Sequence, residues 1–413
     1  MSAAIKLDRD RIRELFDLRR RGGGSFGAYT DDPYPALHRL RETGPVHEGT
    51  VHGLIGFDGP AFFHGLPEPD RPHYSVFSFE VCDAVYRDDT TFRSAPTGAG
   101  RVGVAASMLG MNGAEHRRHR SLVQPSFVPN KAKWWVERWI NETVHGLIDG
   151  FEADGKAELN IDFDAAIPVL TITGSFGLSV DQALDVRAAI EGADAASRLT
   201  DYLVPIVRAR RDEPQDDLIS VLCDAELVDE DGERHRLSDD EIVSFSHLLL
   251  LAGSGTTWKQ MGTTLAALLT TPGALDAVRE DRSLLRLAVE ESVRWCPTDP
   301  MFSRWAASGT SLAGVDIPAG AVVHICLGAA NRDPARWDDP DTYDLHRPLQ
   351  TALGFGGGPH ICLGMHVARA EMLTAIGALI DRLPNLRLDP GAPPPQIIGL
   401  YERGPTEINV VWD

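Results

Sequence analysis

The chain has 413 residues and a mass of 45.0 kDa, with 43% hydrophobic and 24% charged residues. These fractions are close to globular averages and exclude a disordered, collagen-like or coiled-coil protein. Sixty acidic and forty basic residues give a formal net charge of -20. This charge disfavours binding to a phosphate backbone, so nucleic acid is not an expected partner.

Cysteine content and hydropathy favour a reducing compartment. The cysteines are odd in number, widely spaced and without a C-x-x-C pair, so neither a disulfide framework nor a zinc ribbon is indicated. No stretch approaches the roughly 18 uninterrupted apolar residues of a membrane span. We therefore expect a cytoplasmic protein with no membrane partner. The cysteines are Cys82, Cys223, Cys296, Cys326 and Cys362.

Helical periodicity dominates the chain. Residues 1–25 are predicted to form a flexible N-terminal extension, in which a short amphipathic helix precedes an RRRGGG joint at 19–24. Long helices are predicted from 239 to about 270 and from 363 to about 383. In the second of these, apolar residues recur at spacings of three and four, which is typical of a helix that faces a core.

Short strand-like runs accompany the helices. Residues 322–325 and 408–411 are apolar or alternating and lie between Gly and Pro residues, which is typical of short strands. The Pro-rich stretch at 390–395 is predicted to be a loop. No internal repeat and no linker between two large units occurs. Residues 1–413 are therefore interpreted as a single domain, mostly α with minor β sheets.

A glycine-rich loop at 355–364, with the sequence FGGGPHICLG, leads into the second long helix. A cysteine at a helix start is close to the positive end of the helix dipole and to unpaired backbone N–H groups, which favour the thiolate. The glycines leave room for a flat cofactor to approach the backbone, so the Cys362 sulfur could reach a haem iron. The other four cysteines are interpreted as small buried hydrophobic residues.

The same loop meets every fixed position of F-G-x-G-x-H-x-C-x-G, and in this it resembles the haem-binding signature of the cytochrome P450 family, the haem-thiolate monooxygenases. The resemblance covers nearly the whole chain. It implies the family's helix-rich, triangular single-domain fold, with haem b as cofactor. It also implies that Cys362 is the axial thiolate ligand, whose electron density favours O–O cleavage. Phe355 would pack beside the sulfur, Gly364 would contact the cofactor and His360 would reach a haem propionate.

Glu291 and Arg294 lie at an i, i+3 spacing in a predicted helix, which puts them on one face. Such a pair on its own is typical of a solvated surface. The segment resembles the E-x-x-R helix of the family, however, and residues 340–347 resemble the segment that supplies a second arginine, Arg347. The resemblance therefore implies a buried ionic triad of these three side chains, which holds the cysteine loop.

Further basic residues resemble the family's propionate contacts. Arg304 precedes the segments I-P-A-G and A-N-R-D-P in the order of bacterial members, and His116 and Arg120 share one face of a predicted helix. Haem carries two carboxylates, so these three side chains and His360 would neutralise them through charge-assisted hydrogen bonds. The alternative is a basic, solvated helix face.

The long central helix contains the run A-G-S-G-T-T, similar to the family's oxygen-activating segment. The resemblance places Thr256 as the distal threonine, with its hydroxyl bonded to the Ala252 carbonyl. Gly253 would pass over the haem face, because a glycine inside a helix costs about 1 kcal/mol and needs a packing reason. Gly255 departs from the pattern, which has a carboxylate there. The proton route is left open between water, Thr256, Ser254 and a substrate hydroxyl.

By the same resemblance, largely apolar residues line the substrate pocket, which favours a hydrophobic substrate of terpenoid, steroid, fatty-acid or polyketide type. His247, Asp299 and Arg403 are each interpreted either as an anchor for a polar substrate group or as structural. The segment at 49–72 is longer than the hairpin expected there, and no role is assigned to it. The predicted pocket residues are Met108, Leu109, His247, Leu248, Leu251, Met301 and Phe302.

Together these features predict a monooxygenase that inserts one oxygen atom of O2 into a hydrophobic small molecule, by hydroxylation or epoxidation. The resemblance implies electrons from NAD(P)H, delivered by a separate reductase and a ferredoxin or flavodoxin. Gly255 leaves a peroxide-driven peroxygenase open as an alternative. A non-catalytic haem sensor or carrier is the alternative outside catalysis.

Overall fold

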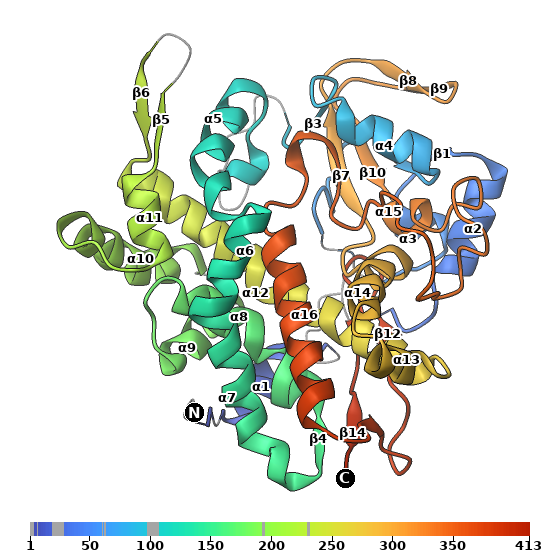
Figure 1. The fold of residues 1–413 in the computed structure, drawn as a ribbon. Coiled ribbons are helices and arrows are strands. Elements are labelled where there is room, and N and C mark those ends of the chain that lie inside the picture. Colours follow the sequence, from blue (N-terminus) through green and yellow to red (C-terminus); the bar gives the residue numbers. More distant parts are fainter. Residues whose placement is uncertain are drawn as a thin grey trace.

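The structure is a computed structural model of the chain. Helices make up most of it and small sheets lie among them, so the predicted class, mostly α with minor β sheets, is confirmed (Figure 1). Within the described ranges, no helix is long and apolar enough to cross a bilayer. The structure describes residues 4–5, 7–18, 29–59, 61, 63–96, 107–191, 195–228 and 232–413.

The two longest predicted helices, at 239–270 and 363–383, correspond to α12 and α16. The described α-helices are α1 (Arg9–Phe16), α2 (Tyr34–Thr43), α3 (Val51–Leu54), α4 (Phe79–Arg87), α5 (Gly113–Val123), α6 (Pro129–Trp135), α7 (Asn141–Phe151), α8 (Ala166–Gly174), α9 (Val180–Glu191), α10 (Ala195–Asp212), α11 (Leu218–Asp224), α12 (Asp239–Thr270), α13 (Ala274–Glu280), α14 (Leu284–Trp295), α15 (Leu327–Ala330) and α16 (Met365–Arg382).

The strands form one larger sheet and several small ones. The described strands are β1 (Val46–Glu48), β2 (His73–Val76), β3 (Phe92–Arg93), β4 (Lys156–Glu158), β5 (Glu226–Val228), β6 (Arg234–Arg236), β7 (Phe302–Ala306), β8 (Thr310–Leu312), β9 (Val315–Ile317), β10 (Val322–Ile325), β11 (Arg387–Leu388), β12 (Ile397–Ile398), β13 (Gly404–Pro405) and β14 (Asn409–Val411). The predicted strands at 322–325 and 408–411 are thus β10 and, in the main, β14.

The larger sheet has the strand order β1-β2-β10-β7-β3. β2 and β10 pair in parallel, with His73 opposite Val322, and the other neighbours pair antiparallel. A second sheet has the order β11-β14-β4, and β5-β6, β8-β9 and β12-β13 form two-stranded pairs. β10 lies between β2 and β7, and all four of its residues, including His324, are buried.

α12 runs through the middle of the helical part, and α8, α10, α14 and α16 pack against it (Figure 1). A capping box starts the helix, in which the Glu241 N–H donates to the Ser238 hydroxyl and the Ser238 N–H donates to the Glu241 carboxylate at 2.8 Å. Every residue from Trp258 to Leu268 is buried. This half of α12 therefore has no solvent-exposed face, which is typical of a helix enclosed on all sides.

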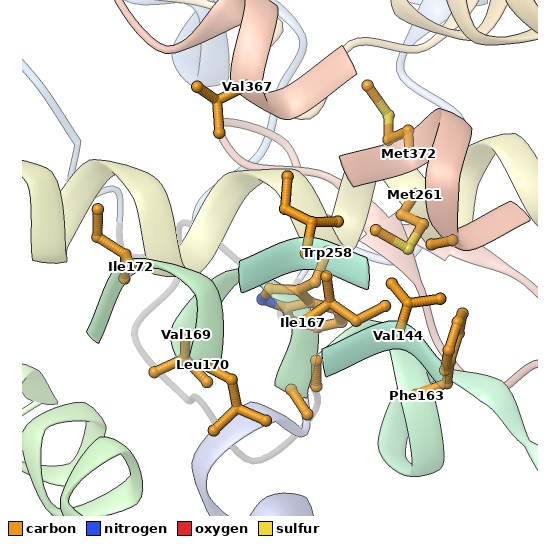
Figure 2. Close-up of a cluster of buried hydrophobic side chains, with 14 of the residues drawn as sticks. Val144, Phe163, Ile167, Val169, Leu170, Ile172, Trp258, Met261, Val367 and Met372 are labelled. Atoms are coloured by element: carbon orange, nitrogen blue, oxygen red, sulfur yellow. The ribbon is translucent and has the colours of Figure 1, made fainter. Parts of the chain in front are cut away.

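Figure 2 shows the apolar cluster around α12, in which Trp258 and Met261 lie among side chains of α8 and α16, including Ile167 and Met372. Trp258 is 1% exposed and Met261 is fully buried. Burying a large apolar side chain contributes about 1.5–3 kcal/mol through transfer from water. These contacts fix α8 and α16 against α12, and both helices carry residues that face the cavity described below.

The N-terminal helix α1 is packed into this core. The Asp8 carboxylate caps it by accepting from two backbone N–H groups, and Ile12 and Phe16 are buried. The Phe16 ring meets Trp258 edge-on, with ring centroids 5.7 Å apart. The prediction of a flexible extension over residues 1–25 is therefore wrong for α1, because two large side chains of an amphipathic helix are enough to anchor it. The RRRGGG joint at 19–24 lies outside the described residues.

The unassigned segment at 49–72 covers the strand β7 near the cavity. It contains α3, and its His64 ring lies between Phe302 and Trp305, with centroid distances of 4.7 and 5.0 Å. The Ser303 hydroxyl donates to the His64 carbonyl at 2.7 Å. The segment thus packs against the side chain of Phe302, a residue of the cavity wall.

Replacing Phe16 with alanine should destabilise the protein by about 3–5 kcal/mol, because it removes a buried ring and leaves a void beside Trp258. Urea unfolding of the cofactor-loaded protein measures this free energy. Glu14→Ala, on the exposed face of the same helix, is the control and should change stability by less than about 0.5 kcal/mol. Equal stability of the two variants would show that α1 does not contribute to the core.

Candidate active site

A cavity lies between α12 and the loop that precedes α16. Its walls also include residues of α5, α8 and β7, so segments from all parts of the sequence meet there. Most of its lining is apolar. The basic side chains His116, Arg120, Arg304 and His360, all predicted to contact the cofactor, lie together in its wall.

The cysteine loop is a tight turn against α4. The Cys362 N–H donates to the Phe355 carbonyl at 2.9 Å. Gly358 has φ +64°, and a Cβ at this position would lie 2.0 Å from the Tyr86 carbonyl oxygen, so only glycine lets the loop lie against α4. α16 begins at Met365, so Cys362 lies in the loop before the helix and not at the helix start predicted for it.

The Cys362 side chain is exposed to the cavity although it lies inside the protein. Burial raises the pKa of its thiol, while the Gly364 N–H and the Arg120 guanidinium lower it. The polypeptide by itself therefore does not favour the thiolate form of Cys362. This is contrary to the prediction made from a position at a helix start. A metal cation bound to the sulfur would supply that stabilisation. Phe355 and Gly364 line the cavity beside it, and a Cβ at Gly364 would meet nothing within 4 Å.

Two imidazole rings stack in the cavity wall. The ring centroids of His116 and His360 are 3.9 Å apart at an interplanar angle of 27°. Burial is the main cause that lowers the pKa of His116 to about 4 and of His360 to about 2, so both rings are neutral at pH 7. The buried Nε2 atom of each ring has no hydrogen-bond partner among the described residues. Because unpaired buried nitrogens are unfavourable, this end of the cavity suits an added polar ligand.

Two guanidinium groups lie beside these rings. Arg304 is buried, and one of its nitrogens donates to the Ser303 carbonyl at 2.9 Å. No carboxylate of the described residues pairs with it, and burial lowers its pKa as it lowers that of Arg120. Two cations and two unpartnered imidazole nitrogens fit a ligand with two carboxylates, as haem b has. The chemistry of the donor set therefore fits the predicted cofactor.

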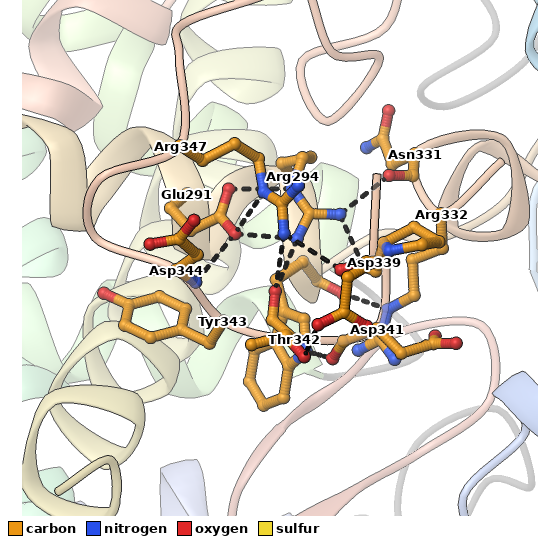
Figure 3. A network of polar contacts seen from close by, with 12 residues as sticks. Glu291, Arg294, Asn331, Arg332, Asp339, Asp341, Thr342, Tyr343, Asp344 and Arg347 are labelled. Carbon is orange, nitrogen blue, oxygen red and sulfur yellow. Dashed lines mark hydrogen bonds and ion pairs between the residues drawn. The ribbon is translucent and has the colours of Figure 1, made fainter. Parts of the chain in front are cut away.

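Glu291, Arg294 and Arg347 form the ionic cluster that was predicted (Figure 3). The Glu291 carboxylate accepts two hydrogen bonds from Arg294, each 2.7 Å long, and one from Arg347 at 3.0 Å. Arg294 also donates to the Asn331 carbonyl at 3.0 Å. The Asn331 side chain in turn accepts from the Leu353 N–H at 2.7 Å. The cluster is thus bonded to the residues just before the cysteine loop.

One face of α12 lines the cavity. Ala252, Gly253 and Thr256 belong to it, and the Thr256 hydroxyl donates to the Ala252 carbonyl at 2.9 Å, as expected. Ser254 and Gly255, which were predicted to belong to the catalytic segment, are outside the lining, and the Ser254 hydroxyl instead donates to a backbone carbonyl of its own helix. That prediction is corrected, because successive residues of a helix point about 100° apart.

A buried arginine lies beside α12 where the family pattern has its acid. Arg187 of α9 is 2% exposed, and its Nη1 donates to the Ser254 hydroxyl at 3.3 Å. A Cβ at Gly255 would lie 3.9 Å from the same nitrogen. A carboxylate at this position would therefore meet a buried cation. This chain thus has a buried arginine at this place, but a glycine where the family pattern has an acidic residue.

The predicted substrate pocket is correct in part. Met108, Leu109, Leu248 and Phe302 line the cavity. They come from the short 3-10 helix Met108–Gly110, from α12 and from β7. The stretch before them, 97–106, lies outside the described residues.

His247, Leu251 and Met301 do not line the cavity. His247 lies near the Thr200 hydroxyl at 3.4 Å, toward α10. Met301 is 1% exposed and is packed with Tyr401 and its neighbours in a separate apolar cluster. The physical reason is the same in each case, since adjacent residues of a helix or an extended segment point to different sides.

The structure adds lining residues that were not predicted. Phe245 and Gln260 continue the stripe of Leu249 and Thr256 along α12 at helical spacings, so counting turns from Thr256 would have found them. Thr171 of α8 and Glu371 of α16 had no such signal. Burial raises the pKa of Glu371 to about 8, so this carboxyl group is protonated at pH 7.

Of the three candidate polar anchors, Asp299 alone lines the cavity. His247 faces Thr200, as described, and Arg403 is buried with its guanidinium donating to the Gly399 carbonyl. The structural interpretation therefore holds for His247 and Arg403.

Comparison with known proteins agrees with this geometry. The cytochrome P450 family model matches residues 186–400. The cytochrome P450 monooxygenase PikC of Streptomyces venezuelae is 31% identical over 396 residues and 90% of each chain. The mycinamicin IV hydroxylase/epoxidase of Micromonospora griseorubida is 35% identical over 327 residues, which is 75% of this chain and 80% of the relative. The crystal structure of CYP109E1 from Bacillus megaterium in complex with testosterone matches with a TM-score of 0.79 at 25% identity, and covers 93% of this chain and 100% of that one.

The chain therefore belongs to the cytochrome P450 family. Its fold is the P450 fold, and members of the family bind haem b through a cysteine thiolate. The protein is accordingly an oxidoreductase that incorporates oxygen into a substrate.

Glu291→Gln should lower the free energy of unfolding by about 3–5 kcal/mol, because it leaves two buried guanidinium groups without a counter-charge. Urea unfolding followed by circular dichroism measures the loss. Glu290→Gln is the matched control, since Glu290 makes a bidentate pair with Arg369 in a more exposed position, with hydrogen bonds of 2.6 and 2.8 Å. That change should cost about 0–1 kcal/mol. Similar losses in both variants would contradict a special role for the buried cluster.

Gly255→Asp should change the fraction of consumed reductant that appears as oxidised product, because it adds a carboxylate next to the buried Arg187 and one residue before Thr256. Gly255→Asn adds the same volume without the charge and is the control. Both measurements use the holoenzyme with a reconstituted electron-transfer chain. If both variants convert the same fraction of consumed reductant into product as the wild type, position 255 has no effect on coupling.

Proposed function

We propose that this chain is a haem-thiolate monooxygenase that inserts one oxygen atom of O2 into a hydrophobic small molecule, by hydroxylation or epoxidation. The observation that carries the proposal is the cavity itself, in which the Cys362 sulfur and the Thr256 face of α12 line one apolar space. Relatives named as a monooxygenase and as a hydroxylase/epoxidase support the reaction type.

In this proposal Cys362 supplies the thiolate ligand, and haem b supplies the activation of O2. His116, Arg120, Arg304 and His360 hold the two propionates, because their unpaired N–H donors and positive charges lie together at one end of the cavity. The flat space beside Gly253 and Gly364 admits the ring, as the absence of close contacts at a Gly364 Cβ supports.

On the side of α12, Thr256 positions water and protons. Its hydroxyl donates to the Ala252 carbonyl, so its oxygen remains free to accept a hydrogen bond from a water in the cavity. The described part of α12 offers no carboxylate to this face, since the acidic residues of the helix are confined to its first turn. At the α12 face, proton transfer then runs through water and Thr256, because the Ser254 side chain lies outside the cavity lining.

We further propose a ferredoxin or flavodoxin, reduced by a separate NAD(P)H-dependent reductase, as the electron donor. The haem cavity lies inside the polypeptide, so electrons reach it through the protein from a partner docked outside. The five cysteines are free thiols, which supports a reducing compartment such as the cytoplasm.

Cys362→Ser should abolish the Soret band typical of a thiolate-bound haem–carbon monoxide complex, because a hydroxyl does not replace a thiolate as a ligand of iron. The spectrum of the reduced, haem-supplemented protein with carbon monoxide measures this. Cys296→Ser, at a buried cysteine outside the cavity lining, is the control and should keep the band. An unchanged spectrum in the Cys362 variant would remove the proposal.

Product analysis then decides between the alternatives. Oxidised product from a reconstituted reductase and ferredoxin supports the monooxygenase, while turnover with hydrogen peroxide alone supports a peroxygenase. A protein that binds haem and ligand but forms no product under either condition is a sensor or carrier.

A further inference from the structure

Asp299 places a carboxylate in the apolar cavity. It lies in the turn between α14 and β7, and this turn is fixed to α12 by hydrogen bonds from Thr298. The Thr298 N–H donates to the Gln260 side chain at 2.9 Å, and its hydroxyl donates to the Thr256 carbonyl at 3.4 Å. Asp299 lines the cavity together with Phe302. Within the part of the chain that the structure describes, its carboxylate makes no hydrogen bond and no ion pair.

Among the described residues, the charged groups around Asp299 include one ammonium group and two carboxylates, its own included. The charged group that acts on its carboxylate is the Lys259 ammonium, which lies on α12 about one turn after Thr256. Lys259 is fully buried and is already paired with the Glu402 carboxylate. Two carboxylates therefore share one ammonium group. A ligand with one positive charge would balance the set.

The ionisation of Asp299 is compatible with this role. Burial raises the pKa of its carboxyl group to about 6, and Lys259 acts in the opposite direction. The group is therefore ionised at pH 7. An ionised carboxylate without a partner in an apolar cavity is unfavourable, and a cationic ligand relieves this cost.

The other titratable groups in the cavity wall do not compete for such a ligand. The Tyr86 hydroxyl keeps its proton because burial raises its pKa, and the Cys362 sulfur is bound to iron under the proposed function. His116 and His360 are neutral, and Glu371 is protonated at pH 7 because burial raises its pKa to about 8. Arg120 and Arg304 are occupied by the propionates under the proposed function, on which this inference rests.

We propose that Asp299 binds a positively charged amino group of the substrate, so that this enzyme acts on hydrophobic amines. The amine-bearing end lies at the turn before β7, and the apolar body lies along the α12 face formed by Leu248, Leu249 and Ala252. Asp299 fixes the orientation of the substrate and selects its class. It is a specificity-determining residue.

The test compares three ligands with the same alkyl chain and different head groups: dodecyltrimethylammonium, dodecanol and dodecanoate. A quaternary ammonium cannot lose a proton or bind iron through nitrogen, so its advantage reports charge alone. Binding to the holoenzyme is followed by the change in haem spin state at concentrations below micelle formation. At pH 7.5 the ammonium should bind about tenfold more tightly than the alcohol, and the carboxylate most weakly.

Asp299→Asn should remove this tenfold preference and leave the dissociation constant of the alcohol within about twofold, which also shows that the variant is folded. Glu402→Gln should weaken ammonium binding as well, because it removes one of the two carboxylates near the Lys259 ammonium and so strengthens the attraction between Lys259 and Asp299. Glu371→Gln is the matched control, since it changes a cavity carboxyl group that is uncharged at pH 7, and it should keep the preference.

The pH dependence of the wild-type enzyme is a test without a variant. A carboxyl group with a pKa of about 6 is charged above that value and neutral below it. The preference for the ammonium over the alcohol should therefore be present at pH 7, where Glu371 is still protonated, and should disappear as the pH falls through about 6.

Equal binding of the ammonium and the alcohol by the wild-type holoenzyme, or a preference that survives in Asp299→Asn, overturns the assignment of Asp299. In either case, an intact thiolate band of the carbon monoxide complex leaves the proposed function standing. Loss of that band in the wild-type protein overturns the proposed function itself.

Discussion

Buried positive charge without an internal counter-charge is the constraint on which this structure depends. Arg294 and Arg347 share the Glu291 carboxylate and form a cluster that is complete within the chain. Arg304 is equally buried, yet among the described residues it has only a backbone carbonyl and aromatic faces as partners. Moving a guanidinium out of water is costly unless an anion accompanies it. Under the proposed function the carboxylates of haem supply that anion, which would link cofactor binding thermodynamically to the stability of the fold.

The position of the Cys362 sulfur is set by contacts outside its own segment. The Glu291 cluster is bonded through Asn331 to the backbone just before the loop, and Gly358 lets the loop lie against α4. A rigid ligand loop is needed because iron–sulfur distance and direction tune the metal. The arginines of the cluster thus act at a distance from the metal, through the backbone that they hold.

The cavity also differs from the family pattern in where its charges lie. On α12 the expected acid is absent, and Arg187 remains on the far side of the helix next to Gly255. The cavity wall instead contains the Asp299 carboxylate, and the ion pair of Lys259 and Glu402 lies near it. An apolar cavity with one unpaired carboxylate discriminates by charge, because the cost of an uncompensated charge exceeds the differences between apolar shapes.

The sequence by itself determined the family, the extents of α12 and α16 and the members of the Glu291 cluster, and it supplied the cysteine that we propose as the ligand. These features depend on local patterns: a ten-residue motif, helical periodicity and fixed spacings. Only the tertiary structure decided that Phe302 lines the cavity while Met301 does not, that Ser254 turns away from it, and that α1 is packed against Trp258. It also brought Asp299, Lys259 and Glu402 together from three separate segments. Such outcomes depend on which elements pack against each other, and no local periodicity carries that information.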